Sequence, residues 1–261
     1  MRGFRLLLLL FAAAGPAAAS PQRIVSMNPC IDQILVGVAD ARQIAGISHW
    51  SHDAAASAMN PAVARRFPAH FGTAEEVMAL RPDLVLLSLH TPLATKAALQ
   101  RMGVQTQEFG VPGSVAESHA QVLAVARAAG HAERGLAMVR AIDRALLASR
   151  HVGAQTPALI RMSSGLTPGE GTLIVQLMGH AGFRNQSAAY GLGMWDMAAV
   201  EPLVRRSPGL LLTDRPERLH PVLRRAGVRA VRFPGNLFAC AGPGMARAAA
   251  RLAEIRRGVR P

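Results

Sequence analysis

Two stretches of the chain repeat one pattern: Glu75-Glu76-Val77-Met78-Ala79-Leu80-Arg81-Pro82-Asp83-Leu84-Val85-Leu86-Leu87 and Glu201-Pro202-Leu203-Val204-Arg205-Arg206-Ser207-Pro208-Gly209-Leu210-Leu211-Leu212. In each, a glutamate stands seven residues before a proline that opens an apolar run. Further along, Leu99-Gln100-Arg101-Met102-Gly103-Val104 is echoed by Leu223-Arg224-Arg225-Ala226-Gly227-Val228, and Phe109 and Phe233 each follow the glycine by six residues. This duplication indicates two equivalent halves.

The prolines separate a helix from a strand in each copy. The residue before a proline disfavours helical backbone, so the helix after Glu75 or Glu201 is expected to end by Pro82 or Pro208. The apolar run that follows has the length of a strand buried on both faces. A second helix is expected to end at Gly103 or Gly227, because glycine suits the position just past a helix C-terminus. The alternation of helix and strand predicts parallel sheets.

A long helix is predicted between the two halves. Each half opens with a strand candidate, over 23–27 and 158–162, and the intervening segment 131–150 has apolar residues at helical spacings, namely Ala137, Val139, Ile142, Leu146 and Leu147. A helix of this length spans about 30 Å. The predicted fold is therefore α/β, with an N-terminal lobe at 20–130, an interlobe spine helix at 131–150 and a C-terminal lobe at 151–261.

The first residues are typical of an export signal. Arg2 and Arg5 precede an apolar core at 6–11, and Ala17-Ala18-Ala19 forms a small-residue cleavage site, so we predict a signal peptide at 1–19. The core is shorter than the ~20 residues that span a bilayer, and no cysteine follows the cut directly to accept a lipid. We predict a soluble periplasmic monomer. The formal charge of +13 comes from scattered arginines, so nucleic acid is not expected as a partner.

These features together resemble the class III periplasmic binding proteins of ABC importers, which handle cobalamin, ferric siderophores and related metal chelates. The similarity covers nearly the whole mature chain and depends on the order of its segments, which are 23–29, 45–48, 75–87, the spine helix, Gly182 with Asn185, 201–212 and 240–243. The resemblance implies two lobes joined by one helix, a ligand in the cleft between them, and an ABC permease with its ATPase as partners.

Candidate ligand-binding residues lie in the loops after the predicted strands, because ligands of open α/β sheets gather at the carboxyl ends of strands. His49, Trp50 and His52 are the most suggestive group, since an aromatic plane between two imidazoles can stack on a flat ligand and also coordinate. The resemblance places Trp50 at an aromatic position of the cleft. The other candidates are Asn28, Cys30 and His90 in the first lobe and Met162, Phe238 and Cys240 in the second.

The two cysteines and the two repeated glutamates have further predicted roles. Cys30 and Cys240 are expected at the cleft from opposite lobes, either joined by a disulfide that pins the lobes together or free to contact the ligand. Glu75 and Glu201 occupy equivalent positions of the repeat, and the resemblance implies that such a pair faces arginines of the permease. The alternative is that they are acids at helix N-termini that only favour the helix dipole.

The ligand expected for these residues is a metal chelate, namely a corrinoid, haem or a ferric siderophore, and no cofactor is expected. One alternative is a binding protein for bare zinc or manganese, but His49-x-x-His52 supplies only two of the three or four ligands that zinc requires, and His70 and His90 would have to complete the set. The other alternative is an exported hydrolase, although Ser163-Ser164-Gly165 lacks the glycine pattern of a nucleophile elbow.

Overall fold

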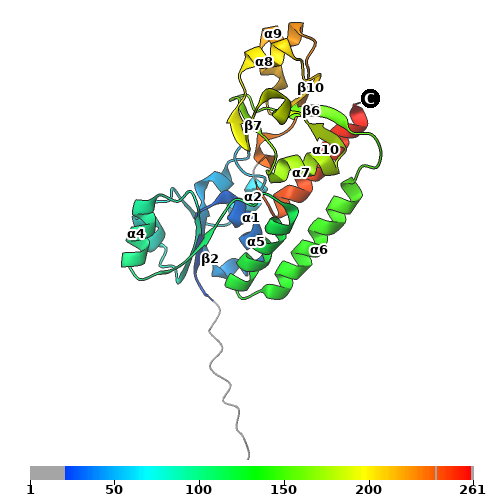
Figure 1. Cartoon of the computed structure of the whole chain (residues 1–261). Coiled ribbons are helices and arrows are strands. Elements are labelled where there is room, and N and C mark those ends of the chain that lie inside the picture. Colours follow the sequence, from blue (N-terminus) through cyan, green and yellow to red (C-terminus); the bar gives the residue numbers. More distant parts are fainter. Residues whose placement is uncertain (1–20, 239, 260–261) are drawn as a thin grey trace, which may run out of the picture.

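The computed structural model describes residues 21–238 and 240–259, so the predicted signal peptide at 1–19 lies outside the described residues. Within these ranges the chain forms two α/β lobes (Figure 1). None of the helices described is both long enough and apolar enough to cross a membrane.

The first lobe is built on a five-stranded parallel sheet with the strand order β3-β2-β1-β4-β5. Its strands are β1 (Ile24–Ser26), β2 (Ile44–Ser48), β3 (Ala69–His70), β4 (Leu84–Ser88) and β5 (Gln105–Phe109). Its helices are α1 (Pro29–Val38), α2 (Pro61–Ala64), α3 (Ala74–Ala79), α4 (Leu93–Arg101) and α5 (Val115–Ala128), with short 3-10 turns η1 (Ala41–Gln43) and η2 (His49–His52).

The second lobe repeats this arrangement around a four-stranded parallel sheet with the order β11-β10-β6-β8. The strands are β6 (Thr156–Ile160), β8 (Phe183–Asn185), β10 (Leu210–Thr213) and β11 (Arg229–Arg232), and a separate antiparallel pair joins β7 (Leu166–Pro168) to β9 (Trp195–Met197). Its helices are α7 (Leu173–His180), α8 (Val200–Arg205), α9 (Pro221–Arg225) and α10 (Pro243–Gly258), with 3-10 turns η3 (Ser187–Tyr190), η4 (Pro216–Arg218) and η5 (Gly235–Leu237).

The predicted duplication is confirmed at the level of individual side chains. Buried residues of β1, β4, α3 and α4 form a cluster on one face of the first sheet, and their counterparts in β6, β10, α8 and α9 form the same cluster on the second. The helix C-termini agree as well: Gly103 and Gly227 follow α4 and α9 with positive φ angles of 73° and 78°, which glycine adopts without steric cost. The two lobes are therefore variants of one α/β unit.

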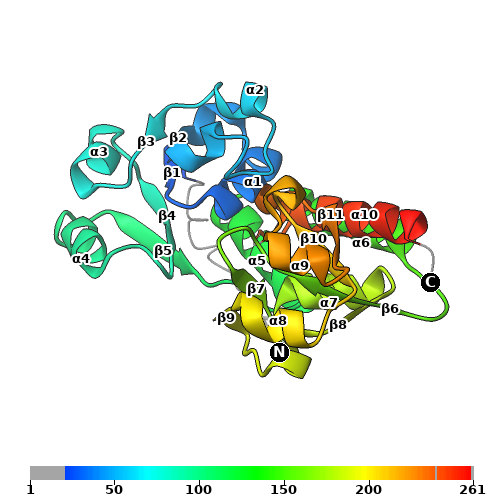
Figure 2. The same ribbon diagram turned by 90° about the horizontal axis from the view of Figure 1, so that it is seen from above.

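Helix α6 (Ala132–Ser149) is the long helix between the lobes, and His131 is its N-cap residue. Helix α6 packs against α1 and α5 of the first lobe and against α10 of the second (Figures 1 and 2). Helix α10 also contacts α1, so one continuous apolar core includes residues of both lobes. Helix α10 comes from the C-terminal half of the chain but packs on the first lobe, so the lobes are not separated at one point of the sequence. We keep the lobe boundaries at residues 130 and 151 as a proposal.

Candidate functional site

The loops after β1, β2 and β4 meet at one edge of the first sheet, because the carboxyl ends of neighbouring parallel strands lie side by side. They enclose a hollow of about 320 Å³, which we call the imidazole hollow. Four of the predicted residues line it, namely Asn28, His49, Trp50 and His90. His70, Phe71 and Met27 line it as well. The sequence offered His70 only as a possible ligand of a bare metal ion, and it gave no indication of Phe71.

Three aromatic rings lie against one another on one wall of the imidazole hollow, with His49 tilted by 39° to Trp50 and by 30° to Phe71. The ring centroid of His49 lies 4.5 Å from that of Trp50 and 4.5 Å from that of Phe71. The side chains of Trp50 and Phe71 are 52% and 73% exposed, which is unusual for such large apolar groups. A flat apolar molecule would remove these surfaces from water, so this wall is suited to stacking on a ring system.

One hydrogen bond assigns the tautomer of the neutral His49 imidazole. Its Nδ1 lies 3.2 Å from the carbonyl oxygen of His70, and a carbonyl can only accept, so Nδ1 carries the hydrogen of the neutral tautomer and Nε2 is the nitrogen with the lone pair in that tautomer. His70 itself is buried, with Nε2 at 2.9 Å from the carbonyl oxygen of Ser26. Burial holds the pKa of His70 below its ordinary value, so this imidazole is neutral at pH 7.

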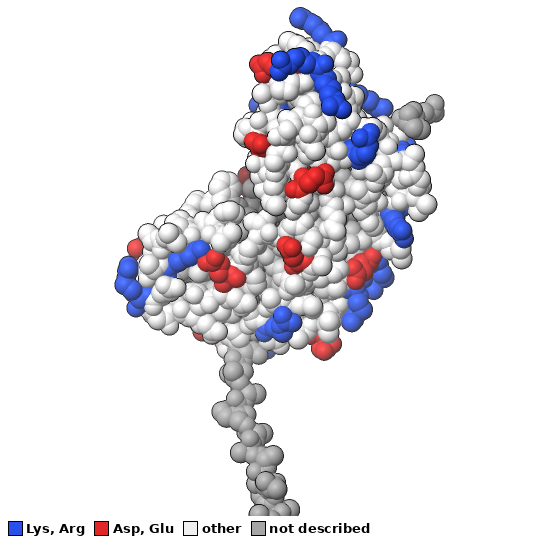
Figure 3. Space-filling view, in the orientation of Figure 1, with Lys and Arg blue, Asp and Glu red and all other residues white. Residues whose placement is uncertain are grey.

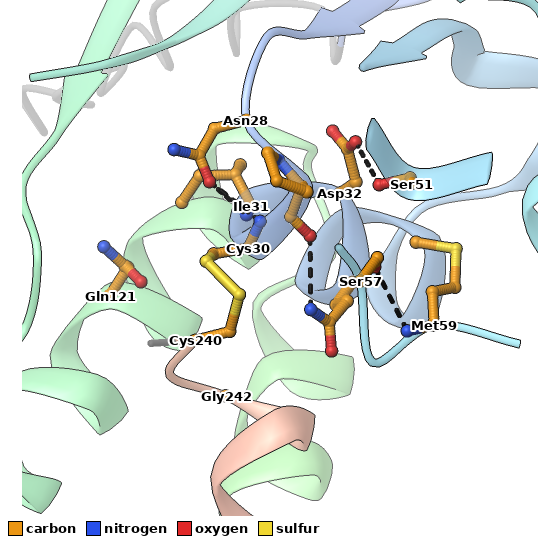
Figure 4. The surroundings of a disulfide bond; sticks show 12 residues. Asn28, Cys30, Ile31, Asp32, Ser51, Ser57, Met59, Gln121, Cys240 and Gly242 are labelled. Carbon is orange, nitrogen blue, oxygen red and sulfur yellow. Dashed lines mark hydrogen bonds between the residues drawn. A yellow bond between two sulfur atoms is a disulfide. The ribbon is translucent and has the colours of Figure 1, made fainter. Parts of the chain in front are cut away.

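The lobes meet below the imidazole hollow at a disulfide between Cys30 and Cys240, whose Cα atoms are 5.0 Å apart (Figure 4). Asn28 lines both the imidazole hollow and a smaller one beside Cys30, and Val111 and Pro112 continue that surface to Phe238 and Cys240. Of the two alternatives that the sequence left open, the structure contains the disulfide. The sulfur atoms are therefore not available as thiolate ligands.

The second lobe adds apolar side chains that the sequence analysis missed. Trp195 on β9 packs edge-on against Phe238, with the ring centroids 5.4 Å apart, and Met194, Trp195 and Met197 are all exposed. In Figure 2, β7 and β9 lie on the side of the second lobe that is turned towards the first. The only sequence signal was a tryptophan between methionines in a glycine-containing loop, and such a pattern does not reveal exposure.

Besides the two cysteines, three predicted residues do not line the imidazole hollow, namely Met162, His52 and Phe238. Met162 follows the end of β6, but its side chain is only 7% exposed and packs in the main core, because the chain turns back at once into β7. His52 ends the turn η2 and does not line the hollow, and its Nε2 is buried without a hydrogen-bond partner among the described residues. Phe238 is also largely buried and supports Trp195 from beneath.

Glu75 and Glu201 are exposed in the first turns of α3 and α8, which are equivalent helices of the two lobes. Glu201 borders a second hollow, of about 540 Å³, which is also lined by Arg161, Arg205 and His220. Arg161 donates from Nε to the carbonyl oxygen of Ala198 at 3.0 Å. On the face shown in Figure 3, cations and acids are interspersed over both lobes, and the surface is recessed between them.

A bare metal ion has no ready site in the described part of the chain, where no three His, Cys, Asp or Glu side chains form a cluster that could hold one. The imidazoles of His49, His70 and His90 line the same hollow without converging on a single point.

Comparison with known proteins identifies the family. Residues 24–231 match the family model described as periplasmic binding protein. The fold is similar to that of the periplasmic haem-binding protein RhuT from Roseiflexus sp. RS-1, with 20% identity, a TM-score of 0.72 and coverage of 90% of this chain and 96% of that one. It is also similar to the vitamin B12-binding protein BtuF of Vibrio cholerae, with 15% identity, a TM-score of 0.70 and coverage of 91% and 97%. A search of curated protein sequences found no match. Because the family model covers most of the chain, this protein belongs to the periplasmic binding protein family.

Proposed function

We propose that the protein captures a flat metal chelate, such as a corrinoid, haem or a ferric siderophore, in the cleft between its lobes and delivers it to an ABC permease. The observation that carries this proposal is the exposed stack of Trp50, His49 and Phe71 on the wall of the imidazole hollow. The volume of the imidazole hollow, about 320 Å³, lies at the lower end of the range for small-molecule sites. The structurally similar proteins that are described as binding haem or vitamin B12 support the same class of ligand.

His49 and His90 are suited to the metal of such a chelate. Histidines that coordinate a metal commonly donate their other ring N–H to a carbonyl oxygen, which is the arrangement of His49 Nδ1 with His70. His90 is exposed and lines the opposite side of the hollow, beyond β4. The chelate supplies the metal, so the protein needs one or two imidazoles and an apolar wall in place of a complete ligand cage.

Binding to Trp50 is tested by titrating the protein with haem and with cyanocobalamin. We expect Trp50→Ala to weaken the binding of the preferred chelate at least tenfold, because burying an aromatic face on a ring contributes about 1.5 kcal/mol or more. Trp195→Phe is the control for loss of a tryptophan signal, and both variants are followed by absorbance of the chelate as well as by fluorescence. Equal affinities of wild type and Trp50→Ala would remove Trp50 from the site.

Ligand binding is expected to close the lobes only slightly. Helix α6 and the disulfide each cross from one lobe to the other, and a continuous helix resists bending more than a pair of loops does. Small-angle scattering profiles of the free and chelate-bound protein should therefore nearly coincide. A closure on the order of tens of degrees, typical of hinged proteins, would contradict this rigidity.

The remaining parts of the proposal concern location and partners. We propose that the mature protein works as a periplasmic monomer without a lipid anchor, and that Glu75 and Glu201 contact the permease. No observation favours the two alternative functions, a binding protein for bare zinc or manganese and an exported hydrolase. The described residues contain no cluster for bare zinc or manganese, and Ser163, the serine considered for a hydrolase, donates its hydroxyl to Asp214 at 2.9 Å.

A further inference from the structure

Asp32, in the first turn of α1, lies directly behind the turn that carries His49 and Trp50. Its carboxyl group is fully buried, and Oδ2 accepts a hydrogen bond from the hydroxyl of Ser51 at 2.6 Å (Figure 4). The same oxygen accepts a second hydrogen bond from the backbone N–H of Ser48 at 3.0 Å. Ser48 and Ser51 bracket the two ligand-facing residues in the sequence. One carboxyl oxygen therefore holds both ends of this turn.

The other carboxyl oxygen indicates which protonation state the structure holds. Asp32 Oδ1 and the hydroxyl of the neighbouring Ser26 are both buried without a hydrogen-bond partner among the described residues. A carboxylate would leave a charged oxygen unsatisfied there, at high cost, whereas a carboxylic acid has a hydrogen to donate at this position. Burial raises the pKa of Asp32 to about 8, against the opposing effect of the hydrogen bonds from Ser51 and Ser48. Asp32 is thus neutral at pH 7.

Among the described residues, no charged group offsets the burial of Asp32. His49 and His52 lie on η2, which packs against α1, and His70 lies on β3, the strand next to β2. Arg247 of α10 reaches Gln33 beside Asp32. None of them contributes a charge effect to Asp32. A proton leaving Asp32 would leave an unpaired buried carboxylate, which water can solvate only if the turn opens.

Contacts with the second lobe hold the start of helix α1, which carries Asp32. Cys30, two residues earlier, is joined to Cys240 of the second lobe, and Gly242 packs so closely on Ile34 that a side chain at that glycine would collide with it. The chain just after the turn is also held, because Asn236 of the second lobe donates to the carbonyl oxygen of Ala54 at 2.9 Å. The segment from Ser48 to His52 is therefore the part that responds when the bonds to Asp32 change.

We propose that Asp32 is the positioning residue of the ligand-facing turn: as a neutral acid it holds Ser48 and Ser51, and its ionisation opens the turn and weakens ligand binding. That Asp32 holds the turn follows from the hydrogen bonds and burial alone. The effect on ligand affinity rests on the proposed function. The folded protein keeps a proton on Asp32 that the unfolded chain releases near its ordinary value, so this group also lowers stability as the pH rises from about 4 to about 8.

The positioning role is tested without ligand in a Trp195→Phe background, where Trp50 is the only tryptophan. Acrylamide quenching of Trp50 emission is measured from pH 6 to pH 9.5, chosen to bracket the pKa of about 8. We expect quenching to rise with a midpoint near pH 8 in this background and to stay flat after Asp32→Asn, which mimics the neutral acid. Asp53→Asn is the matched control, because Asp53 is an exposed acid at the other end of the same turn.

Two further measurements keep the proposal falsifiable if Asp32→Asn does not fold. Ser51→Ala removes one of the two bonds to Asp32 and is expected to increase Trp50 quenching already at pH 7. In otherwise unaltered protein, haem affinity is expected to fall at least tenfold between pH 6.5 and pH 9.5, a range that spans the pKa. A flat quenching profile in the Trp195→Phe protein, or an unchanged profile after Asp32→Asn, overturns the effect of Asp32 ionisation on the turn. Unchanged Trp50 quenching after Ser51→Ala overturns the positioning role.

The outcomes separate this inference from the proposed function. If haem and cyanocobalamin fail to bind at any pH but Trp50 quenching still titrates through Asp32, the positioning role stands and the chelate proposal fails. If haem binds equally well at both ends of the pH range while Trp50 quenching changes, the link between the turn and affinity is wrong.

Discussion

Replacing both cysteines, as Cys30→Ala with Cys240→Ala, is expected to lower the free energy of unfolding by roughly 5 kcal/mol. The bond closes a loop with a sequence separation of 210 residues, and the chain-entropy model assigns roughly this value to so long a loop. Both residues also pack at the lobe junction, so their loss relaxes contacts between the lobes. Urea denaturation of the oxidised wild type and of the double variant measures the difference.

A matched variant separates the covalent link from ordinary contacts at the junction. Asn236→Ala removes hydrogen bonds between the second lobe and the carbonyl oxygens of Ala54 and Ser57, and it is expected to cost only about 1 kcal/mol. A double cysteine variant as stable as Asn236→Ala would show that the disulfide contributes little. The same double variant is expected to close further on ligand binding, because only helix α6 and packing then join the lobes.

The second large effect concerns delivery. Glu75→Arg together with Glu201→Arg is expected to abolish uptake while ligand affinity and fold remain unchanged. The two acids are exposed at equivalent places on the two lobes. An exposed ion pair contributes less than about 1 kcal/mol, so each single variant should lose only part of its uptake. Charge reversal at both ends of an interface sets like charges opposite each other and costs several kcal/mol, so the double variant should lose all of it.

Transport of chelate into vesicles that contain the cognate permease and ATPase measures this effect. The control is Glu133→Arg with Asp143→Arg, which makes the same change in net charge at exposed positions of α6. Normal uptake by the Glu75→Arg, Glu201→Arg protein, with chelate binding verified, would show that both acids only favour the dipoles of α3 and α8.

Much of the site could be anticipated because strand ends are predictable from a repeat. Once Pro82 and Pro208 locate β4 and β10, the loops after the neighbouring strands must lie at one edge of each sheet, and Asn28, His49, Trp50 and His90 follow from that rule. Phe71 could not be found in this way, because it follows the two-residue strand β3, whose pattern is too short to recognise. Asp32 was missed because its position on α1 gives no sign of the serines that contact it.

The sequence by itself determined the duplicated α/β plan, because prolines, glycines and buried apolar runs act on local backbone and therefore leave a pattern in the chain. Only the tertiary structure decided between a disulfide and two free thiols at Cys30 and Cys240, since that choice depends on a distance between residues in opposite lobes. Only the tertiary structure shows that Met162 is buried and that Trp195 and Phe71 are exposed, because burial depends on which parts of the chain pack against each side chain. The protonation of Asp32 has the same origin: burial raises its pKa, and the depth of burial is set by β1, β2 and η2 together.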